Sequence, residues 1–183
     1  MQSAQSIVQM FMRKHLVHML YFSHIKDSRT KKVKKEKQTY KGGNVMKVIA
    51  VSHGSYSKGL VDSVQMLVGE QENLVAYGLF PEQTVATLTE QLEKEVNDTP
   101  EGEEILFLTD LFHGSPFNAV VSLMRDHEFH HITGINIPLA VEVMMGRYAD
   151  KNAEEICRGI MEAAPDTVKY VNDLFDDDEE EEE

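Results

Sequence analysis

Short apolar runs alternate with stretches of helical periodicity between residues 46 and 175. Runs rich in Val, Ile and Leu are typical of strands buried on both faces of a parallel sheet, and they occupy residues 47–51, 74–80, 105–109 and 131–135. Apolar positions three or four residues apart indicate amphipathic helices, which occupy residues 60–68, 85–96, 115–124, 138–147 and 152–164. The third helix has a clear start, because Ser115 suits an N-cap and Pro116 a first helical residue.

Strands that alternate with helices predict an α/β fold, with an open, mostly parallel sheet and helices on both faces. We expect the strand order 2-1-3-4, which places the first and third strands side by side. Residues 167–171 could form a short final strand. The chain shows no internal repeat.

The formal charge of −13 is unevenly distributed along the 183 residues. Residues 1–45 contain ten basic and two acidic residues, whereas residues 46–183 contain eight basic and 29 acidic residues. The last eight residues, 176–183, are all acidic. Dense like charge with few apolar residues favours solvation over packing. We therefore expect a basic, disordered or non-native extension over 1–45, one folded domain over 46–175, and a disordered acidic tail over 176–183.

The basic extension has three interpretations. It could bind acidic lipid or RNA, or residues 7–22 could form an amphipathic helix on a membrane. Alternatively, translation starts at Met46, since Lys41-Gly42-Gly43 is consistent with a purine-rich ribosome-binding sequence upstream of that codon. We favour the third interpretation, which a native protein whose intact mass includes residues 1–45 would exclude.

Composition excludes several classes of function. A domain this acidic is unsuited to duplex nucleic acid, because affinity for phosphates depends on Lys and Arg. Cys157 is the only cysteine, so the chain can form neither an internal disulfide nor a thiolate metal cluster. A reducing compartment is the simplest interpretation of that count. No stretch reaches the roughly 18 consecutive apolar residues of a membrane-spanning helix.

Two polar residues stand at the predicted carboxyl ends of neighbouring strands, His53 after the first and Asp110 after the third. Ligands of open α/β sheets bind beyond these ends, where the strand order reverses. A carboxylate that holds one imidazole nitrogen leaves the other free as a nucleophile, and the helix near Ser115 offers unpaired N–H groups to an anion. These groups suit transfer of a phosphoryl group onto histidine. Two hydrogen-bonded loop residues without a catalytic role are about equally consistent with the pattern.

Three ordered motifs of the chain resemble the enzyme IIA components of the mannose family (mannose/fructose/sorbose) of the bacterial phosphoenolpyruvate-dependent sugar phosphotransferase system. They are Met46-Lys-Val-Ile-Ala-Val-Ser-His-Gly54, Phe107-Leu-Thr-Asp110 with Gly114-Ser-Pro-Phe-Asn118, and Gly134-Ile-Asn-Ile-Pro138. The resemblance extends from Met46 to about Val171 and leaves out residues 1–45.

The resemblance implies a phosphoryl relay in sugar uptake. His53 would accept a phosphoryl group from the phosphocarrier protein HPr and pass it to the IIB component, while Asp110 orients the His53 ring. Backbone N–H groups near Ser115 would hold the phosphoryl oxygens, and Gly54 would allow their close approach. Such a protein is a phosphotransferase with a phosphohistidine intermediate (EC 2.7.1.-).

The resemblance also implies the surroundings of this reaction. No metal or other cofactor takes part, and the membrane IIC and IID components are indirect partners. The family is cytoplasmic and associates transiently with the membrane transporter. It forms homodimers, with the final strand, here residues 167–171, exchanged between subunits.

One position departs from the family pattern, and two other functions remain open. His113 stands where glycine or another small residue is expected, and we interpret it as a tolerated loop substitution, although it could also contact the phosphoryl group. The chain could instead be the phosphoryl donor subunit of a dihydroxyacetone kinase, or a regulatory module that only docks partners. The transported sugar cannot be inferred, because the membrane components contact it.

Overall fold

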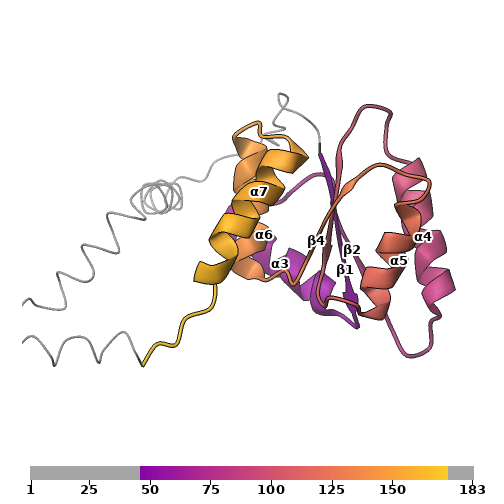
Figure 1. Cartoon of the computed structure of the whole chain (residues 1–183), viewed down its shortest axis with the longest axis horizontal. Coiled ribbons are helices and arrows are strands. Elements are labelled where there is room, and N and C mark those ends of the chain that lie inside the picture. Colours follow the sequence, from indigo (N-terminus) through magenta and orange to yellow (C-terminus); the bar gives the residue numbers. More distant parts are fainter. Residues whose placement is uncertain (1–45, 173–183) are drawn as a thin grey trace, which may run out of the picture. The chain divides into compact units, whose positions relative to one another are not determined.

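A sheet of four parallel strands lies at the centre of the part of the chain that the structure describes, residues 46–172 of a computed structural model (Figure 1). The strand order is β2-β1-β3-β4, which confirms the predicted α/β fold and its 2-1-3-4 order. The strands are β1 Lys47–His53, β2 Leu74–Leu79, β3 Ile105–Thr109 and β4 His130–Thr133. The predictions for residues 1–45 and 176–183 lie outside the described range.

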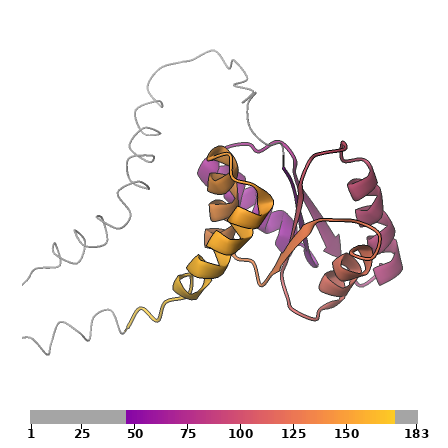
Figure 2. The ribbon, with the colours of Figure 1, turned by 45° about the horizontal axis from the view of Figure 1, so that its top comes forward.

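Helices cover both faces of this sheet, as predicted (Figures 1 and 2). One face packs against α3 (Tyr56–Val68), α6 (Ile137–Tyr148) and α7 (Ala153–Ala163). The other face packs against α4 (Val85–Asn97) and α5 (Ser115–Leu123). A short 3₁₀ helix, Ala164–Asp166, follows α7.

Alternation of side chains along β1 and β3 gives the domain two apolar cores, because successive residues of a strand point to opposite faces. Val48 belongs to the core beneath α3 and α6, whereas Ile49 and Phe107 belong to the core beneath α4 and α5. All three are fully buried. Burial on both faces explains why these strands read as continuous apolar runs and not as alternating ones.

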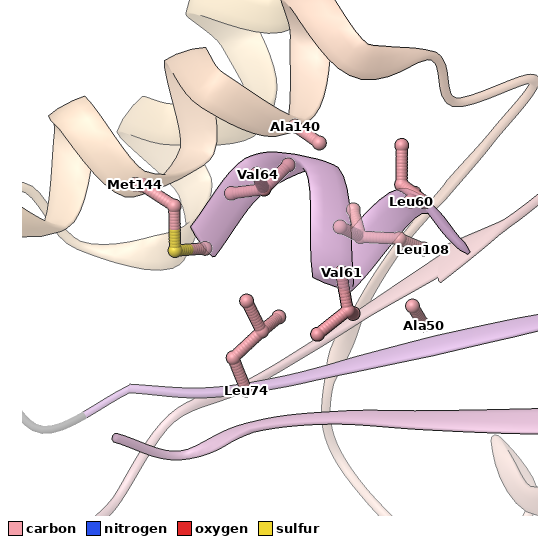
Figure 3. Close-up of a pocket in the computed structure, with 8 residues that line it drawn as sticks. All are labelled: Ala50, Leu60, Val61, Val64, Leu74, Leu108, Ala140 and Met144. Carbon is pink, nitrogen blue, oxygen red and sulfur yellow. The ribbon is translucent and has the colours of Figure 1, made fainter. Parts of the chain in front are cut away.

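A small cavity lies where α3 passes over the sheet beneath α6 (Figure 3). Its lining is entirely apolar: Ala50, Leu60, Val61, Val64, Leu74, Leu108, Ala140 and Met144. A binding pocket needs at least a few polar groups to orient its ligand. We therefore regard this cavity as imperfect core packing and not as a ligand site.

Side chains cap three of the helices. Thr84, Asn136 and Asn152 each accept a hydrogen bond from a backbone N–H in the first turn of α4, α6 and α7. The N-cap residues of α3 and α5 make no such bond, and the N-cap of α5 is Gly114, which has no side chain. The predicted N-cap, Ser115, is instead the first helical residue, so that prediction was wrong by one position.

Residues 167–171, predicted as a short strand, do not form one within the described chain. A strand needs a neighbour, and the predicted neighbour belongs to a second subunit. The exchange of this segment in a dimer therefore stays a prediction. Such a segment would have to pair with an edge strand of the sheet, and the two edge strands are β2 and β4.

Candidate active site

The sheet brings His53 and Asp110 together at its carboxyl edge. β1 and β3 are neighbours, with Val51 opposite Thr109, so His53 at the end of β1 lies beside Asp110, which directly follows β3. His53 Nδ1 lies 2.9 Å from Asp110 Oδ2, and the backbone N–H of His53 donates to the same oxygen at 2.9 Å. Strand pairing alone thus joins two residues that are 57 positions apart.

The Asp110 carboxylate is held at both oxygens. Oδ2 accepts the two hydrogen bonds from His53, and Oδ1 accepts one from the backbone N–H of Leu111 at 2.9 Å. An ionised carboxylate accepts hydrogen bonds only, so the facing Nδ1 carries the proton of a neutral imidazole. The lone pair of the histidine is then on Nε2. Since 46% of the His53 side chain is exposed, a second protein can reach this ring.

A tight backbone contact supports the turn after His53. Gly54 has a φ of +53°, a conformation that favours glycine, and its N–H donates to the Leu79 carbonyl at 2.9 Å. A Cβ at Gly78 would lie 2.1 Å from the Gly54 carbonyl oxygen. Because its N–H is already bonded, Gly54 could serve a phosphoryl group only by its lack of a side chain.

The first turn of α5 lies beside the histidine. The N-cap Gly114 is close to the ring, since a Cβ there would be 2.7 Å from His53 Cε1 and 3.5 Å from Nε2. Amides of a first helical turn have no acceptor within the helix, and no side chain caps this one. The backbone N–H groups that begin at Ser115 are therefore suited to an anion bound near Nε2.

Tyr56 is a neighbour of the site that sequence reasoning missed. Its hydroxyl donates to the Ile135 carbonyl at 2.7 Å, which ties the start of α3 to the segment before α6. Burial, and secondly the charge of Asp110, raise the pKa of Tyr56 above its ordinary value. The hydroxyl therefore stays protonated and keeps its role as a donor. No motif in the sequence signalled this contact.

A second missed feature is the pair of Thr109 and His131 beneath α5. Thr109 is fully buried, and its hydroxyl lies 2.9 Å from His131 Nε2. The His131 ring also packs against Phe117 of α5, with ring centroids 5.2 Å apart. Burial lowers the pKa of His131 to about 4. A neutral His131 thus supports α5 and the end of β3 from below.

His113 adopts a left-handed backbone conformation, with φ of +60°. Glycine adopts that conformation most easily, which explains why a small residue was expected here. The His113 ring packs on Phe112 at 3.7 Å between centroids and near Phe117 at 5.7 Å. These contacts give the ring a packing role in the loop, in keeping with a tolerated substitution.

Two other properties of residues 46–172 bear on function. Their His, Cys, Asp and Glu side chains include no group of three arranged to hold a metal ion. None of their helices combines the length and the apolar character that a membrane crossing requires.

The fold and this site together define a class of protein: an open parallel α/β domain with a carboxylate-bound, solvent-accessible histidine at its carboxyl edge. The comparison with protein families identifies the class further. Residues 47–161 match the family model EIIA-man, described as "PTS system fructose IIA component". The chain belongs to this family, and its resemblance to the mannose-family IIA components is confirmed.

Curated relatives carry related names. The fructose-specific EIIA component of Bacillus subtilis is 36% identical over 101 residues, which are 55% of this chain and 69% of that protein. The mannose-specific EIIAB component of Escherichia coli K12 is 32% identical over 123 residues, which are 67% of this chain. The match spans only 38% of that longer protein.

Solved structures share the fold. A putative sugar phosphotransferase system permease from Klebsiella pneumoniae aligns with a TM-score of 0.62 and 30% identity, covering 73% of this chain and 96% of that one. A phosphotransferase component EIIA from Streptococcus agalactiae aligns with a TM-score of 0.64, covering 69% of this chain and 98% of that one. At 24% identity, the second likeness bears on the fold alone.

Proposed function

We propose that the protein relays phosphoryl groups in sugar uptake, with Nε2 of His53 as the acceptor. The observation that carries this proposal is the 2.9 Å contact between His53 Nδ1 and Asp110 Oδ2 beside the uncapped start of α5. It leaves a lone pair on Nε2 of a ring that is 46% exposed, next to amides suited to phosphoryl oxygens. Membership of the EIIA-man family supports the same conclusion.

In the first transfer, the Nε2 lone pair attacks the phosphorus of a phosphohistidine on HPr. The new P–Nε2 bond forms while the P–N bond of the donor breaks, and the donor nitrogen keeps that electron pair. Asp110 stabilises the positive charge that develops on the His53 ring, since it accepts the Nδ1–H bond. The amides at the start of α5 stabilise the charge on the phosphoryl oxygens.

In the second transfer, His53 is the donor and the IIB component is the acceptor. A nucleophilic side chain of IIB forms a new bond to phosphorus while the P–Nε2 bond breaks; Nε2 keeps that electron pair, and the ring returns to its neutral state on Asp110. Both steps depend on alignment and on charge stabilisation by fixed groups. We place the protein in the cytoplasm as a homodimer that meets the IIC and IID components through IIB. Relatives are named for fructose, mannose and sorbose, so the sugar stays unassigned.

The proposal is tested by incubating the full chain with phosphoenolpyruvate, enzyme I and HPr. We expect one acid-labile phosphate per chain, absent in His53→Gln and retained in His113→Gln. Loss of phosphate in His113→Gln with retention in His53→Gln would move the acceptor to His113. No phosphate on the wild-type chain would leave a docking module as the function. Transfer onward to dihydroxyacetone kinase subunits but not to IIB would favour that kinase.

A further inference from the structure

Gly114 has an ordinary backbone conformation, so the backbone does not explain why a glycine stands there. Its φ and ψ are −72° and 165°, extended values that any residue adopts. It is also the N-cap of α5, where Ser, Thr, Asn or Asp would supply the missing cap hydrogen bond. The chain forgoes that stabilisation at this helix, although it has it at α4, α6 and α7.

The space around Gly114 does explain the glycine. A Cβ at this position would lie 2.7 Å from His53 Cε1, well inside the distance at which two carbon atoms can approach. It would also lie 3.2 Å from the Leu111 carbonyl oxygen. That carbonyl cannot easily move away, because it accepts the Gly114 N–H at 3.2 Å. The His53 ring is therefore the group that a side chain at position 114 would displace.

We propose that Gly114 is a positioning residue for the reaction at His53. Because Gly114 has no side chain, the Cε1–Nε2 edge of the imidazole ring can lie against the start of α5. This contact keeps Nδ1 on Asp110 and directs Nε2 toward the first-turn amides. The expected effect on the rate of phosphorylation rests on the proposed function. The position of the ring is a property of the unphosphorylated protein.

The geometry explains why the ring cannot simply adjust. Cε1 lies between the two ring nitrogens, so a push on it turns the ring about its side-chain bonds. Any such turn moves Nδ1 relative to Asp110. The carboxylate cannot follow, because its other oxygen accepts a hydrogen bond from the Leu111 backbone N–H. The Nδ1–H form then loses its preference, and part of the population carries the proton on Nε2. A protonated Nε2 has no lone pair for phosphorus.

Gly114→Ala tests this proposal, and Gly59→Ala is the matched control. Gly59 lies within α3, where an added Cβ would have no neighbour within 4 Å. In full-length unphosphorylated protein labelled with ¹⁵N, we expect wild type and Gly59→Ala to show His53 in the Nδ1–H form. Gly114→Ala should show a mixture of the two forms. Its initial rate of phosphorylation by phospho-HPr should fall at least about tenfold, because small misplacements of reacting atoms have large effects on rate.

A double variant separates positioning from folding. If Gly114→Ala lowers the melting temperature, adding His53→Ala removes the ring and should restore it, because the two positions are coupled by direct contact. If the melting temperature is not restored, the added Cβ clashes with the Leu111 carbonyl and not with the ring, and the proposal is overturned. A folded Gly114→Ala protein with the wild-type ring signals and a rate within twofold would also overturn it. If wild type accepts no phosphate at all, the proposed function fails, and the ring signals still decide the role of Gly114.

Discussion

Asp110 makes three hydrogen bonds with one carboxylate, and two of them go to the same residue. The bond from the His53 backbone fixes the distance between the two strand ends. The bond at Nδ1 fixes the ring. A substitution that keeps the shape of Asp110 should still disturb the site. An amide of the same shape has one acceptor oxygen and one donor NH₂ group, whereas the carboxylate has two acceptor oxygens.

Asp110→Asn should therefore slow phosphorylation of His53 by about 100-fold or more while the protein stays folded. If the amide oxygen takes the place of Oδ1 and accepts from the Leu111 N–H, the NH₂ group takes the place of Oδ2 and faces Nδ1 of His53. The ring then favours the form with its proton on Nε2. The rate is measured by incorporation of labelled phosphate from phospho-HPr, with circular dichroism as the check on folding. Asp62→Asn is the control, since Asp62 is exposed and paired with Lys58; a rate for Asp110→Asn within threefold of that control would contradict the prediction.

His131 should make stability depend on pH. Burial lowers its pKa from the ordinary 6.5 to about 4, so between these values the unfolded chain binds a proton that the folded chain does not. Its contribution is complete above pH 6.5 and is lost as the pH falls toward 4. The loss should reach about 2 kcal/mol, allowing for partial exposure. Urea unfolding of wild type between pH 7 and 5 measures it.

His131→Gln provides the comparison for that measurement, because Gln can still bond the Thr109 hydroxyl but does not titrate. Its free energy of unfolding should fall less steeply between pH 7 and 5 than that of wild type. Parallel curves for the two proteins would show that another group is responsible.

At the scale of elements, the turn after β1 depends on close packing between two backbones. Gly78→Ala would place a Cβ 2.1 Å from the Gly54 carbonyl oxygen. Since a backbone atom of a strand-end turn has little freedom to move, we expect a loss of about 2 kcal/mol or more in the free energy of unfolding. Denaturant titration at neutral pH measures the change.

Gly159→Ala is the control for this effect. Gly159 lies within α7, where an added Cβ meets no neighbour within 4 Å. Alanine is the better helix former by up to about 1 kcal/mol, so this variant should be as stable as wild type or more so. A Gly78→Ala protein as stable as Gly159→Ala would mean that the turn can shift without cost.

The elements that could be predicted are those whose own residues determine them. Strands such as β3 are continuous apolar runs, and helices such as α4 repeat their apolar residues at helical spacing. Their order then placed His53 and Asp110 at one edge. The packing of Gly114 against the His53 ring could not be predicted, because no local pattern encodes a distance between the end of one strand and the start of a distant helix. The start of α5 was predicted one residue late for the same reason, because its N-cap is Gly114, which lies beside the His53 ring, and not the favoured cap residue Ser115.

At the scale of the whole molecule, charge works against the proposed ligand. Residues 46–175 contain 21 acidic and eight basic residues, so the domain as a whole repels a phosphoryl group. Attraction must come from groups within a few ångströms of Nε2, where fixed amides act at short range. The proposed function therefore needs first-turn amides of α5 that no side chain caps, which is how the structure has them. A side-chain oxygen there would accept the same hydrogen bonds that the phosphoryl oxygens need.

The predicted homodimer also belongs to this scale, and a substitution at Val168 can test it. It lies in the segment predicted to be exchanged between subunits, and 80% of its surface is exposed in the single chain. A β-branched apolar residue that exposed is suited to a strand which a second subunit covers. The edge strands of the sheet, β2 and β4, offer hydrogen bonds to such a strand. We expect the wild-type chain to have twice its mass of 20.8 kDa in solution.

Val168→Asp should convert this dimer to a monomer, because a carboxylate would be buried without a partner when the strand is exchanged. Sedimentation equilibrium measures the mass of each protein, and circular dichroism establishes that the variant is folded. Met66→Asp is the matched control, since Met66 is 84% exposed and lies in α3, outside the segment 167–171, and it should remain a dimer. If Val168→Asp keeps the dimer, the interface lies elsewhere. If the wild-type chain is itself a monomer, the segment after the 3₁₀ helix has some other role.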